Sequence, residues 1–136
     1  MWTYEQLTGD LRYDGKVVAS GYSGHEEGKN NPAMQHVPNS GPIPVGYYTI
    51  LAPRTTETHG PYVMPLEPFK QNQMFGRAGF LIHGDSIKAP GTASEGCIII
   101  GRSVREAIWQ SGDRTLKVVA GGDDNPVADL DGEISV

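Results

Sequence analysis

The sequence is short of cysteine, of long apolar runs and of basic residues, and each shortage excludes a class of protein. A single cysteine among 136 residues excludes an internal disulfide. No stretch approaches the roughly 18 apolar residues of a membrane-spanning helix. Eleven Lys and Arg against 16 Asp and Glu give a net charge of -5, whereas nucleic-acid binding needs a basic stripe. We therefore expect neither membrane insertion nor a nucleic-acid partner.

The first residues, MWTYEQLTGDLRYDG, also lack the features of a classical signal peptide. Such a peptide begins with basic residues and continues into an apolar run, and neither feature occurs here. The sequence therefore predicts that any export takes another route.

The acidic residues are distributed unevenly. Five acids without a nearby base fall within residues 121–136, namely Asp123, Asp124, Asp129, Asp131 and Glu133. Residues 1–120 then hold eleven acids and eleven bases. Because a chain of this length is sufficient for one hydrophobic core, we expect one neutral domain over residues 1–120 and an acidic tail over residues 121–136.

The composition favours a mostly β, single-domain fold of the sandwich or barrel-like kind. Eighteen Gly and 10 Pro are more than a helical bundle tolerates. Residues 21–44 are so rich in Gly, Asn, Ser and Pro that they predict a long ordered loop. One helix is expected, because Ser103 and Glu106 form a capping-box pattern, and it should end near residues 111–112. Strands are predicted over residues 2–7, 11–13, 16–20, 45–51, 62–66, 79–85, 96–101 and 115–120.

The segment IHGDSIKAPGTASEGCIII, residues 82–100, carries the chemistry. His83 ends one predicted strand and Cys97 begins the next. If these strands pair as neighbours, the two side chains become directly opposed, with Cβ atoms about 4.5 to 5.5 Å apart. A thiol becomes a nucleophile when a neighbouring imidazole takes its proton. The pattern therefore predicts Cys97 as the nucleophile and His83 as its base.

Residues around this pair predict the supporting parts of a catalytic centre. Gly96 permits close approach of the backbone, so the N–H groups near residues 96 and 97 are candidates for holding an oxyanion. Ser94 and Asp85 are candidates to fix the loop or to orient the imidazole, with a backbone carbonyl as the alternative. We place Cys97, His83, Ser94 and Gly96 in the catalytic centre.

A purely structural interpretation competes with this one. Cysteine is among the most frequently buried residue types, and a Cys before three isoleucines is also typical of a small core residue. The joint placement of the cysteine with His83, Gly84, Ser94 and Gly96 favours the catalytic interpretation.

These residues resemble the catalytic domain of the YkuD-type L,D-transpeptidases. The signature of that family is His-Gly, followed after a loop by Ser-His-Gly-Cys and a hydrophobic residue. Residues 83–84 match its first part, and Ser94, Gly96, Cys97 and Ile98 match its second part. GPIPVGYYTI, residues 41–50, is similar to the Pro-x-Gly-x-aromatic strand entry of such domains.

The sequence departs from the family pattern at two positions that bear on substrate binding. Glu95 stands in place of the second histidine, and Ile99 replaces the arginine that often follows, with Arg102 as the nearest substitute. An arginine is the natural partner of a stem-peptide carboxylate. The substrate-binding candidates are Gly84, Asp85, Tyr22, Arg77 and Arg102.

The whole chain is most similar to a compact branch of that family, the L,D-transpeptidase-like toxins of type VI secretion. The segments GYSG, KNNP, GPIP, IHGDS and SEGCI carry this similarity. It implies an L,D-carboxypeptidase or L,D-transpeptidase that acts on peptidoglycan tetrapeptide stems without a cofactor, removing or exchanging the terminal D-alanine. It also implies an antibacterial toxin that acts in the periplasm of a target bacterium and has a possible cognate immunity protein.

Three alternatives follow from other residues. His25, Glu26, His36 and His59 are conceivable metal ligands beside His83, but their spacing matches no tight zinc pattern. We therefore expect no metal, and we expect EDTA to leave activity unchanged. A non-catalytic wall-binding module on the same fold is the second alternative. The third is a secreted protein that is recognised through residues 121–136.

Overall fold

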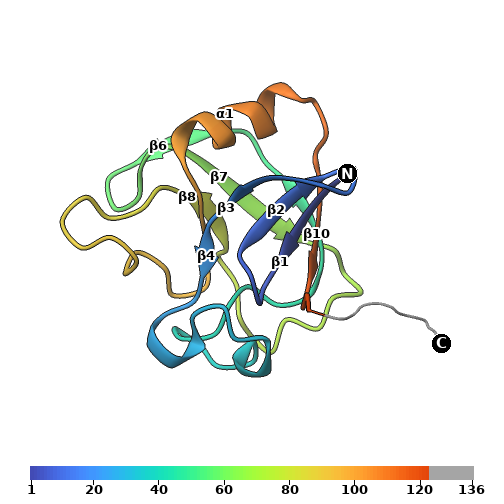
Figure 1. Ribbon diagram of the computed structural model, residues 1–136, viewed down its shortest axis with the longest axis vertical. Helices are drawn as coiled ribbons and strands as arrows, with labels where there is room; N and C mark the ends of the chain where they lie inside the picture. Colours follow the sequence, from blue (N-terminus) through green and yellow to red (C-terminus); the bar gives the residue numbers. More distant parts are fainter. Residues whose placement is uncertain (123–136) are drawn as a thin grey trace.

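A computed structural model of the protein describes residues 1–122, which form one mostly β domain with a single α-helix, as the sequence predicts (Figure 1). Helix α1 spans Arg102–Gln110 and lies across one end of the strands. The strands are β1 (Trp2–Glu5), β2 (Asp10–Tyr13), β3 (Lys16–Ser20), β4 (Tyr22–Ser23), β5 (Gly46–Ile50), β6 (Arg54–Thr56), β7 (Gly60–Pro68), β8 (Leu81–His83), β9 (Ile98–Ile99) and β10 (Thr115–Val119). Of the predicted acidic tail, residues 123–136 lie outside the described residues.

The strands form one continuous path in the order β3-β2-β1-β10-β5-β7-β8-β9-β4, with β6 paired to β7. Two of these pairings are parallel, β1 with β10 and β8 with β9. The first and last described strands are therefore neighbours in the middle of the sheet. The second parallel pair carries the candidate site.

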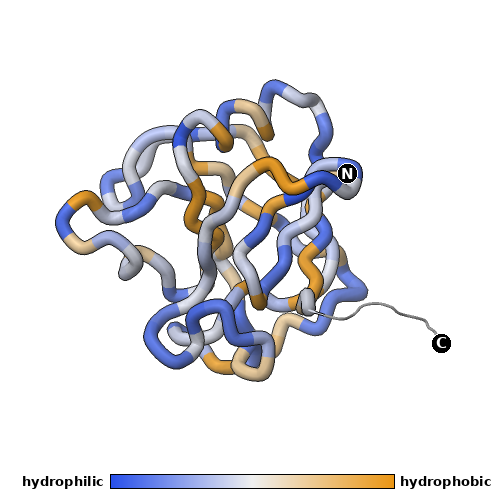
Figure 2. Tube along the Cα trace, viewed as in Figure 1, coloured by the Kyte–Doolittle hydropathy of each residue, from blue (hydrophilic) through white to orange (hydrophobic). Residues whose placement is uncertain are grey.

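The hydrophobic core lies on the inner faces of the strands and under the helix (Figure 2). Buried and more exposed residues alternate along the strands, because successive side chains point to opposite faces, and the buried ones form this core. On β10, for example, Leu116 and Val118 are buried while the residues between and beside them are only partly so. The largest fully buried apolar side chains are Tyr4, Tyr48, Leu11, Ile43, Ile50, Met64, Ile82, Ile98, Ile108 and Leu116. Full burial of each such side chain contributes about 1.5 to 3 kcal/mol.

The long loop predicted over residues 21–44 is ordered, and it packs against the site. It starts with the short strand β4 and contains two 3₁₀ turns, Glu26–Gly28 and Pro32–Met34. The buried Ser23 hydroxyl donates to the Gly96 carbonyl at 2.8 Å and accepts from the Ile43 N–H at 2.9 Å. These bonds tie both ends of the loop to the residue that precedes the cysteine.

The predicted capping box is wrong, although the helix itself is confirmed. The N-cap is Gly101, which has no side chain to cap the helix, and Ser103 lies inside the first turn. Glu106 accepts from the Arg102 guanidinium at 3.0 Å instead of capping the backbone. The extended conformation of Gly101 lets the chain turn into the helix directly after β9, so the helix starts two residues earlier than the capping pattern indicates.

Several strand boundaries also differ from the prediction. Residues 62–66 are the centre of the nine-residue β7, because Pro61 and Pro65 do not interrupt it. Residues 79–85 and 96–101 contribute only the short strands β8 and β9. Strand β6 was not predicted, since its sequence RTT carries little of the apolar alternation that marks a strand.

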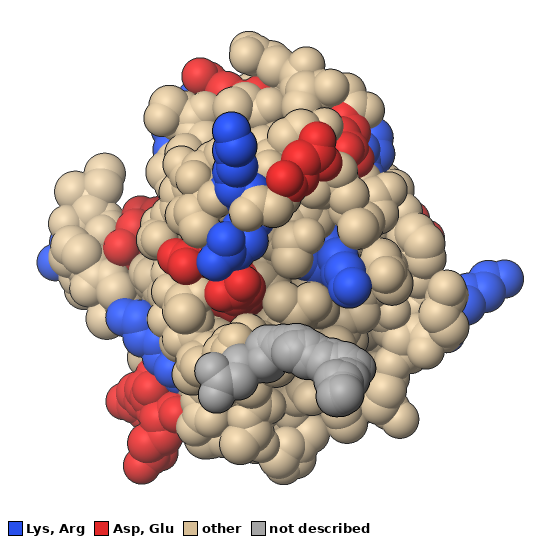
Figure 3. Space-filling view, turned by 45° about the vertical axis from the view of Figure 1, so that its right-hand side comes forward, with Lys and Arg blue, Asp and Glu red and all other residues tan. Residues whose placement is uncertain are grey.

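Among residues 1–122, no helix combines the length and the apolar character needed to cross a bilayer. Charges of both signs are interspersed on the face shown in Figure 3, where basic side chains form no continuous stripe.

Candidate active site

The strands that carry His83 and Cys97 pair as predicted, but they run parallel and the two residues are not directly opposed. Ile82 pairs with Ile98 and His83 with Ile99. Continuing this register places Cys97 abreast of Leu81, diagonal to His83. Diagonal neighbours on one face lie about 7 to 8 Å apart, with their Cβ atoms somewhat closer. The prediction of direct opposition fails because the loop between the strands is long enough to carry the chain back and start the second strand in the same direction.

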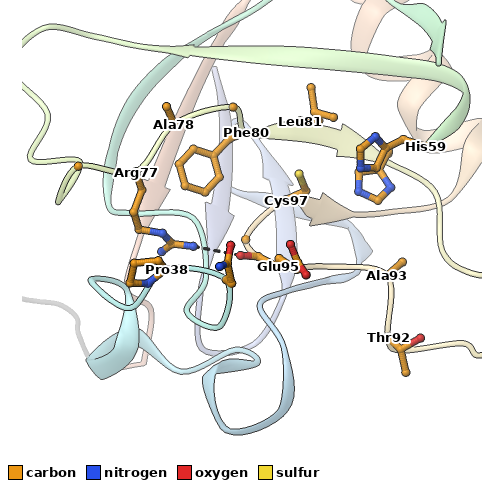
Figure 4. A pocket seen from close by; sticks show the side chains of 15 residues that line it. Pro38, His59, Arg77, Ala78, Phe80, Leu81, Thr92, Ala93, Glu95 and Cys97 are labelled. Atoms are coloured by element: carbon orange, nitrogen blue, oxygen red, sulfur yellow. Dashed lines mark hydrogen bonds between the residues drawn. The ribbon is translucent and has the colours of Figure 1, made fainter. Parts of the chain in front are cut away.

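Cys97 and His83 nevertheless line the same pocket of a cleft, and this pocket has a volume of about 550 Å³. In Figure 4 the cysteine lies between Phe80 and His59, with Arg77 and Pro38 at one end of the cleft. Cys97 is partly buried and is not paired in a disulfide. A cysteine at the wall of a cleft contradicts the interpretation of Cys97 as a sealed core residue.

The cleft has two arms that share His59, His83, Thr92 and Ala93. The Cys97 arm continues along Arg77, Phe80, Leu81, Glu95 and Gly96. The Arg105 arm continues along Pro61, Gly84, Asp85, Ser86, Lys88 and Arg105. The imidazole of His83 therefore stands where the two arms meet.

The Cys97 thiol is protonated at neutral pH in the free protein. Burial raises its pKa to about 11, and the neighbouring Glu95 charge acts in the same direction. The backbone N–H of Leu81, which hydrogen-bonds the thiol, and the Arg77 guanidinium act in the opposite direction and offset only part of this effect. The thiol therefore needs a base nearby to become a nucleophile.

His83 has the properties of that base. Its side chain is only 3% exposed, and Nδ1 lies 2.9 Å from the Gly84 carbonyl oxygen, which can only accept a hydrogen bond. This contact places the proton on Nδ1 and leaves the lone pair on Nε2, which is buried and has no hydrogen-bond partner. Burial lowers the pKa of His83 below its ordinary 6.5, and the charges of His59 and Arg105 act in the same direction. The ring is therefore neutral and can accept a proton at pH 7. Of the three groups proposed to orient it, the backbone carbonyl is the one that does so.

Ser94 and Gly96 shape the turn before Cys97. The fully buried Ser94 hydroxyl donates to the Cys97 carbonyl at 2.6 Å and accepts from the N–H groups of Gly24 and Gly96 at 2.8 and 3.0 Å. Gly96 has φ +144, and a Cβ there would lie 2.6 Å from Arg77 Nη2. Only glycine fits this position. Because the Gly96 N–H is donated to Ser94, the N–H of Cys97 is the better candidate for the donor to an oxyanion.

Asp85 and Tyr22 fix the loop that connects His83 to Cys97. The Tyr22 hydroxyl donates to the Asp85 carboxylate at 2.5 Å and accepts from the Ala93 N–H at 2.9 Å. The same carboxylate accepts from the N–H groups of Ser86 and Gly91. Although Asp85 lines the Arg105 arm, it makes no hydrogen bond to His83.

Arg77 lines the Cys97 arm, but its donors are already used. Its Nη1 donates to the carbonyls of Gln35 and Pro42 at 2.6 and 2.9 Å, and its Nη2 donates to those of Gly41 and Glu95 at 2.9 and 3.1 Å. All four terminal N–H groups therefore hold the long loop against the turn that precedes Cys97. The sequence made Arg77 a candidate for binding a substrate carboxylate, and only its Nε remains available for that role.

The structure does not bring Arg102 to either arm. Its side chain is half exposed, pairs with Glu106 and lies over the Tyr62 ring. Arg105, one turn further along α1, lines the cleft instead. The helical periodicity of the sequence could have identified Arg105, because this residue lies three positions before the buried Ile108 and therefore on the same face of the helix.

His59 is the other site residue that the sequence did not identify. It sits in the turn that leads into β7, and its ring centroid lies 4.5 Å from that of His83. No local pattern marks it, because β7 carries it to the site through pairing with β8. The remaining histidines lie elsewhere, His25 beside Glu26 and His36 against Phe75. Within residues 1–122, no three His, Cys, Asp or Glu side chains are grouped to hold a metal ion.

The fold and the site together define a class of protein. It is a mostly β domain in which the single cysteine, a candidate nucleophile, shares a cleft with a neutral, buried histidine. The model of the Tlde1 domain matches residues 17–121, which is well over half of the chain, so the protein belongs to the Tlde1 domain family. This family comprises type VI secretion effector domains. No curated protein matches the chain.

Proposed function

We propose that this effector domain is a cysteine enzyme of the bacterial cell wall, an L,D-carboxypeptidase, an L,D-transpeptidase or both, that acts on peptidoglycan tetrapeptide stems. One observation carries the proposal: the unpartnered Nε2 of His83 is buried at the wall of the cleft that also holds the Cys97 thiol. An unprotonated imidazole nitrogen without a partner is a suitable acceptor for a thiol proton.

The first half of the reaction forms a thioester. The Cys97 proton passes to His83 Nε2, and the thiolate attacks the carbonyl on the L side of the L-D bond. A carbon–sulfur bond forms, the carbon–nitrogen bond to D-alanine breaks, and His83 returns the proton to the leaving amine. The Cys97 N–H is the proposed donor to the oxyanion, since the Gly96 N–H is held by Ser94.

The second half of the reaction decides between hydrolysis and transfer. His83 takes a proton from water or from the amine of another D-amino acid, and the resulting nucleophile attacks the thioester. The carbon–sulfur bond breaks and the thiol is restored. Hydrolysis releases a tripeptide stem, whereas transfer leaves a stem with a different terminal residue.

The secretion class of the family supports a biological setting for this reaction. A type VI effector that cleaves stem peptides would act in the periplasm of the recipient bacterium and would poison its cell wall. The producing cell would then need an immunity protein that blocks the cleft.

Mass spectrometry of purified tetrapeptide muropeptides tests the proposal. Wild type should release D-alanine, and with excess of a second D-amino acid it should also yield the exchanged stem. Cys97→Ala should reduce either product by about three orders of magnitude or more. Val17→Ala, an exposed substitution on β3, is the matched control and should keep wild-type turnover. Unchanged muropeptides with folded wild-type protein would refute the enzymatic proposal.

The high pKa of the thiol favours one second candidate, a wall-binding module without catalysis. This version predicts that Cys97→Ala keeps both binding to sacculi and toxicity in the periplasm of a recipient cell. The enzymatic version predicts that binding remains and toxicity is lost, so the two measurements together separate the candidates.

A further inference from the structure

Arg105 is a buried cation without a carboxylate partner among residues 1–122. It is 5% exposed, and three of its N–H groups are donated to backbone carbonyls, Nε to Ile100 at 3.0 Å and Nη1 to Pro61 and Tyr62 at 3.0 and 2.9 Å. The two N–H groups of Nη2 have no acceptor in the described part of the chain. A buried guanidinium that lacks an anion is costly. Its free donors are suited to a carboxylate.

Arg77 provides the comparison, because it is the other arginine at the cleft. All four of its terminal N–H groups are donated to carbonyls. Of the two arginines, only Arg105 keeps a terminal nitrogen free for a ligand.

The surroundings of Nη2 leave it open to the cleft. Arg105 lines its arm together with Gly84, and a Cβ at Gly84 would lie 2.8 Å from Nη2. A glycine at this position therefore leaves that part of the guanidinium uncovered. Lys88 adds a second positive charge to the arm. The one acid there, Asp85, is already bound by Tyr22 and by two backbone N–H groups.

The order of groups along the cleft matches the order of groups in a stem peptide that is being cleaved. Cys97 lies in one arm, His83 at the junction and Arg105 in the other arm. In the substrate, the attacked carbonyl is followed by the leaving nitrogen and then, one carbon further, by the terminal carboxylate. If the leaving nitrogen receives its proton from His83 at the junction, the terminal carboxylate next to it lies towards the Arg105 arm.

We propose that Nη2 of Arg105 binds the terminal carboxylate of the leaving D-amino acid, so that the Arg105 arm selects stem peptides with a free C-terminus. This inference rests on the proposed function, because it takes the leaving group to be a D-amino acid. Under this assignment, the enzyme acts at the end of the stem. A stem whose terminal carboxylate is capped is then a poor substrate.

Two peptides test this assignment, a tetrapeptide stem that ends in D-alanine and the same stem that ends in D-alaninamide. For wild type, the kcat/KM of the acid should exceed that of the amide by about 10- to 100-fold, as expected for hydrogen bonds to a charged group. In Arg105→Gln this ratio should fall to about one. In Arg77→Gln, the matched control at the other arm, the ratio should stay at the wild-type value.

The ratio remains informative if a variant folds poorly, because both peptides meet the same fraction of folded protein. A wild type without preference for the acid, or an Arg105→Gln variant that keeps the preference, overturns the inference. If neither peptide is cleaved, the proposed function fails, and calorimetry with Cys97→Ala then tests Arg105 by binding alone. Tighter binding of the acid that disappears in Cys97→Ala/Arg105→Gln supports the carboxylate site, and equal binding of both peptides refutes it.

Discussion

Cys97 and His83 owe their chemical states to burial more than to nearby charges. Burial disfavours whichever form of a group is charged. It therefore raises the pKa of the thiol and lowers that of the imidazole. The free protein therefore holds a neutral thiol and a neutral imidazole on the same cleft, and in the proposed reaction the transfer of the thiol proton would create an ion pair there. In the proposed reaction, a bound substrate that consumes the thiolate would favour this transfer.

The state of the thiol can be measured without any substrate. Alkylation of Cys97 by iodoacetamide requires the thiolate, so with a pKa of about 11 the rate should still rise about tenfold per pH unit between pH 9 and pH 10. Mass spectrometry follows the modification. The same chain unfolded in urea is the control, and its rate should level off over this interval because its thiol is close to the ordinary pKa of 9.0. Equal profiles for the two states would show that the fold does not raise the pKa of this thiol.

At the scale of elements, the parallel pair β8 and β9 forms the site together with the loop between them. The register of this pair sets the spacing of His83 and Cys97. The buried Ser94 hydroxyl then connects the end of the loop to Gly24 in the long loop. The site therefore depends on two loops that are ordered by hydrogen bonds to buried groups.

Ser94→Ala tests this dependence. The substitution leaves the N–H groups of Gly24 and Gly96 and the Cys97 carbonyl without their partner. We expect a loss of about 2 to 4 kcal/mol in the free energy of unfolding, measured in urea, because unsatisfied buried groups are costly. Ser86→Ala, which removes one exposed hydrogen bond to Ala89 in the same loop, should lose less than about 1 kcal/mol. Equal losses would mean that Ser94 does not anchor the loops.

At the scale of the molecule, the pairing of β1 with β10 joins the two ends of the domain. β10 lies between β1 and β5, and its Leu116 and Val118 belong to the core. The strands on either side of β10 therefore form one sheet only when the last strand is present.

Two truncations test this arrangement. A chain that ends at Gly112 lacks β10 and should show no cooperative transition in thermal unfolding, because the core loses one of its central strands. A chain that ends at Gly122 keeps every described strand and should unfold cooperatively. It should also keep the turnover of muropeptides, and a loss of turnover would assign a role to the acidic tail. A cooperative transition in the shorter chain would contradict the central place of β10.

The sequence by itself identified most of the elements and the candidate pair of cysteine and histidine. Glycine and proline content excluded a helical bundle, local alternation located most strands, and the His-Gly and Ser-x-Gly-Cys segments identified His83 and Cys97, because these are short-range signals. Only the tertiary structure decided the parallel register, the partners of Arg77, and the presence of His59 and Arg105 at the cleft. Each of these depends on contacts between segments far apart in the chain, which local patterns do not specify.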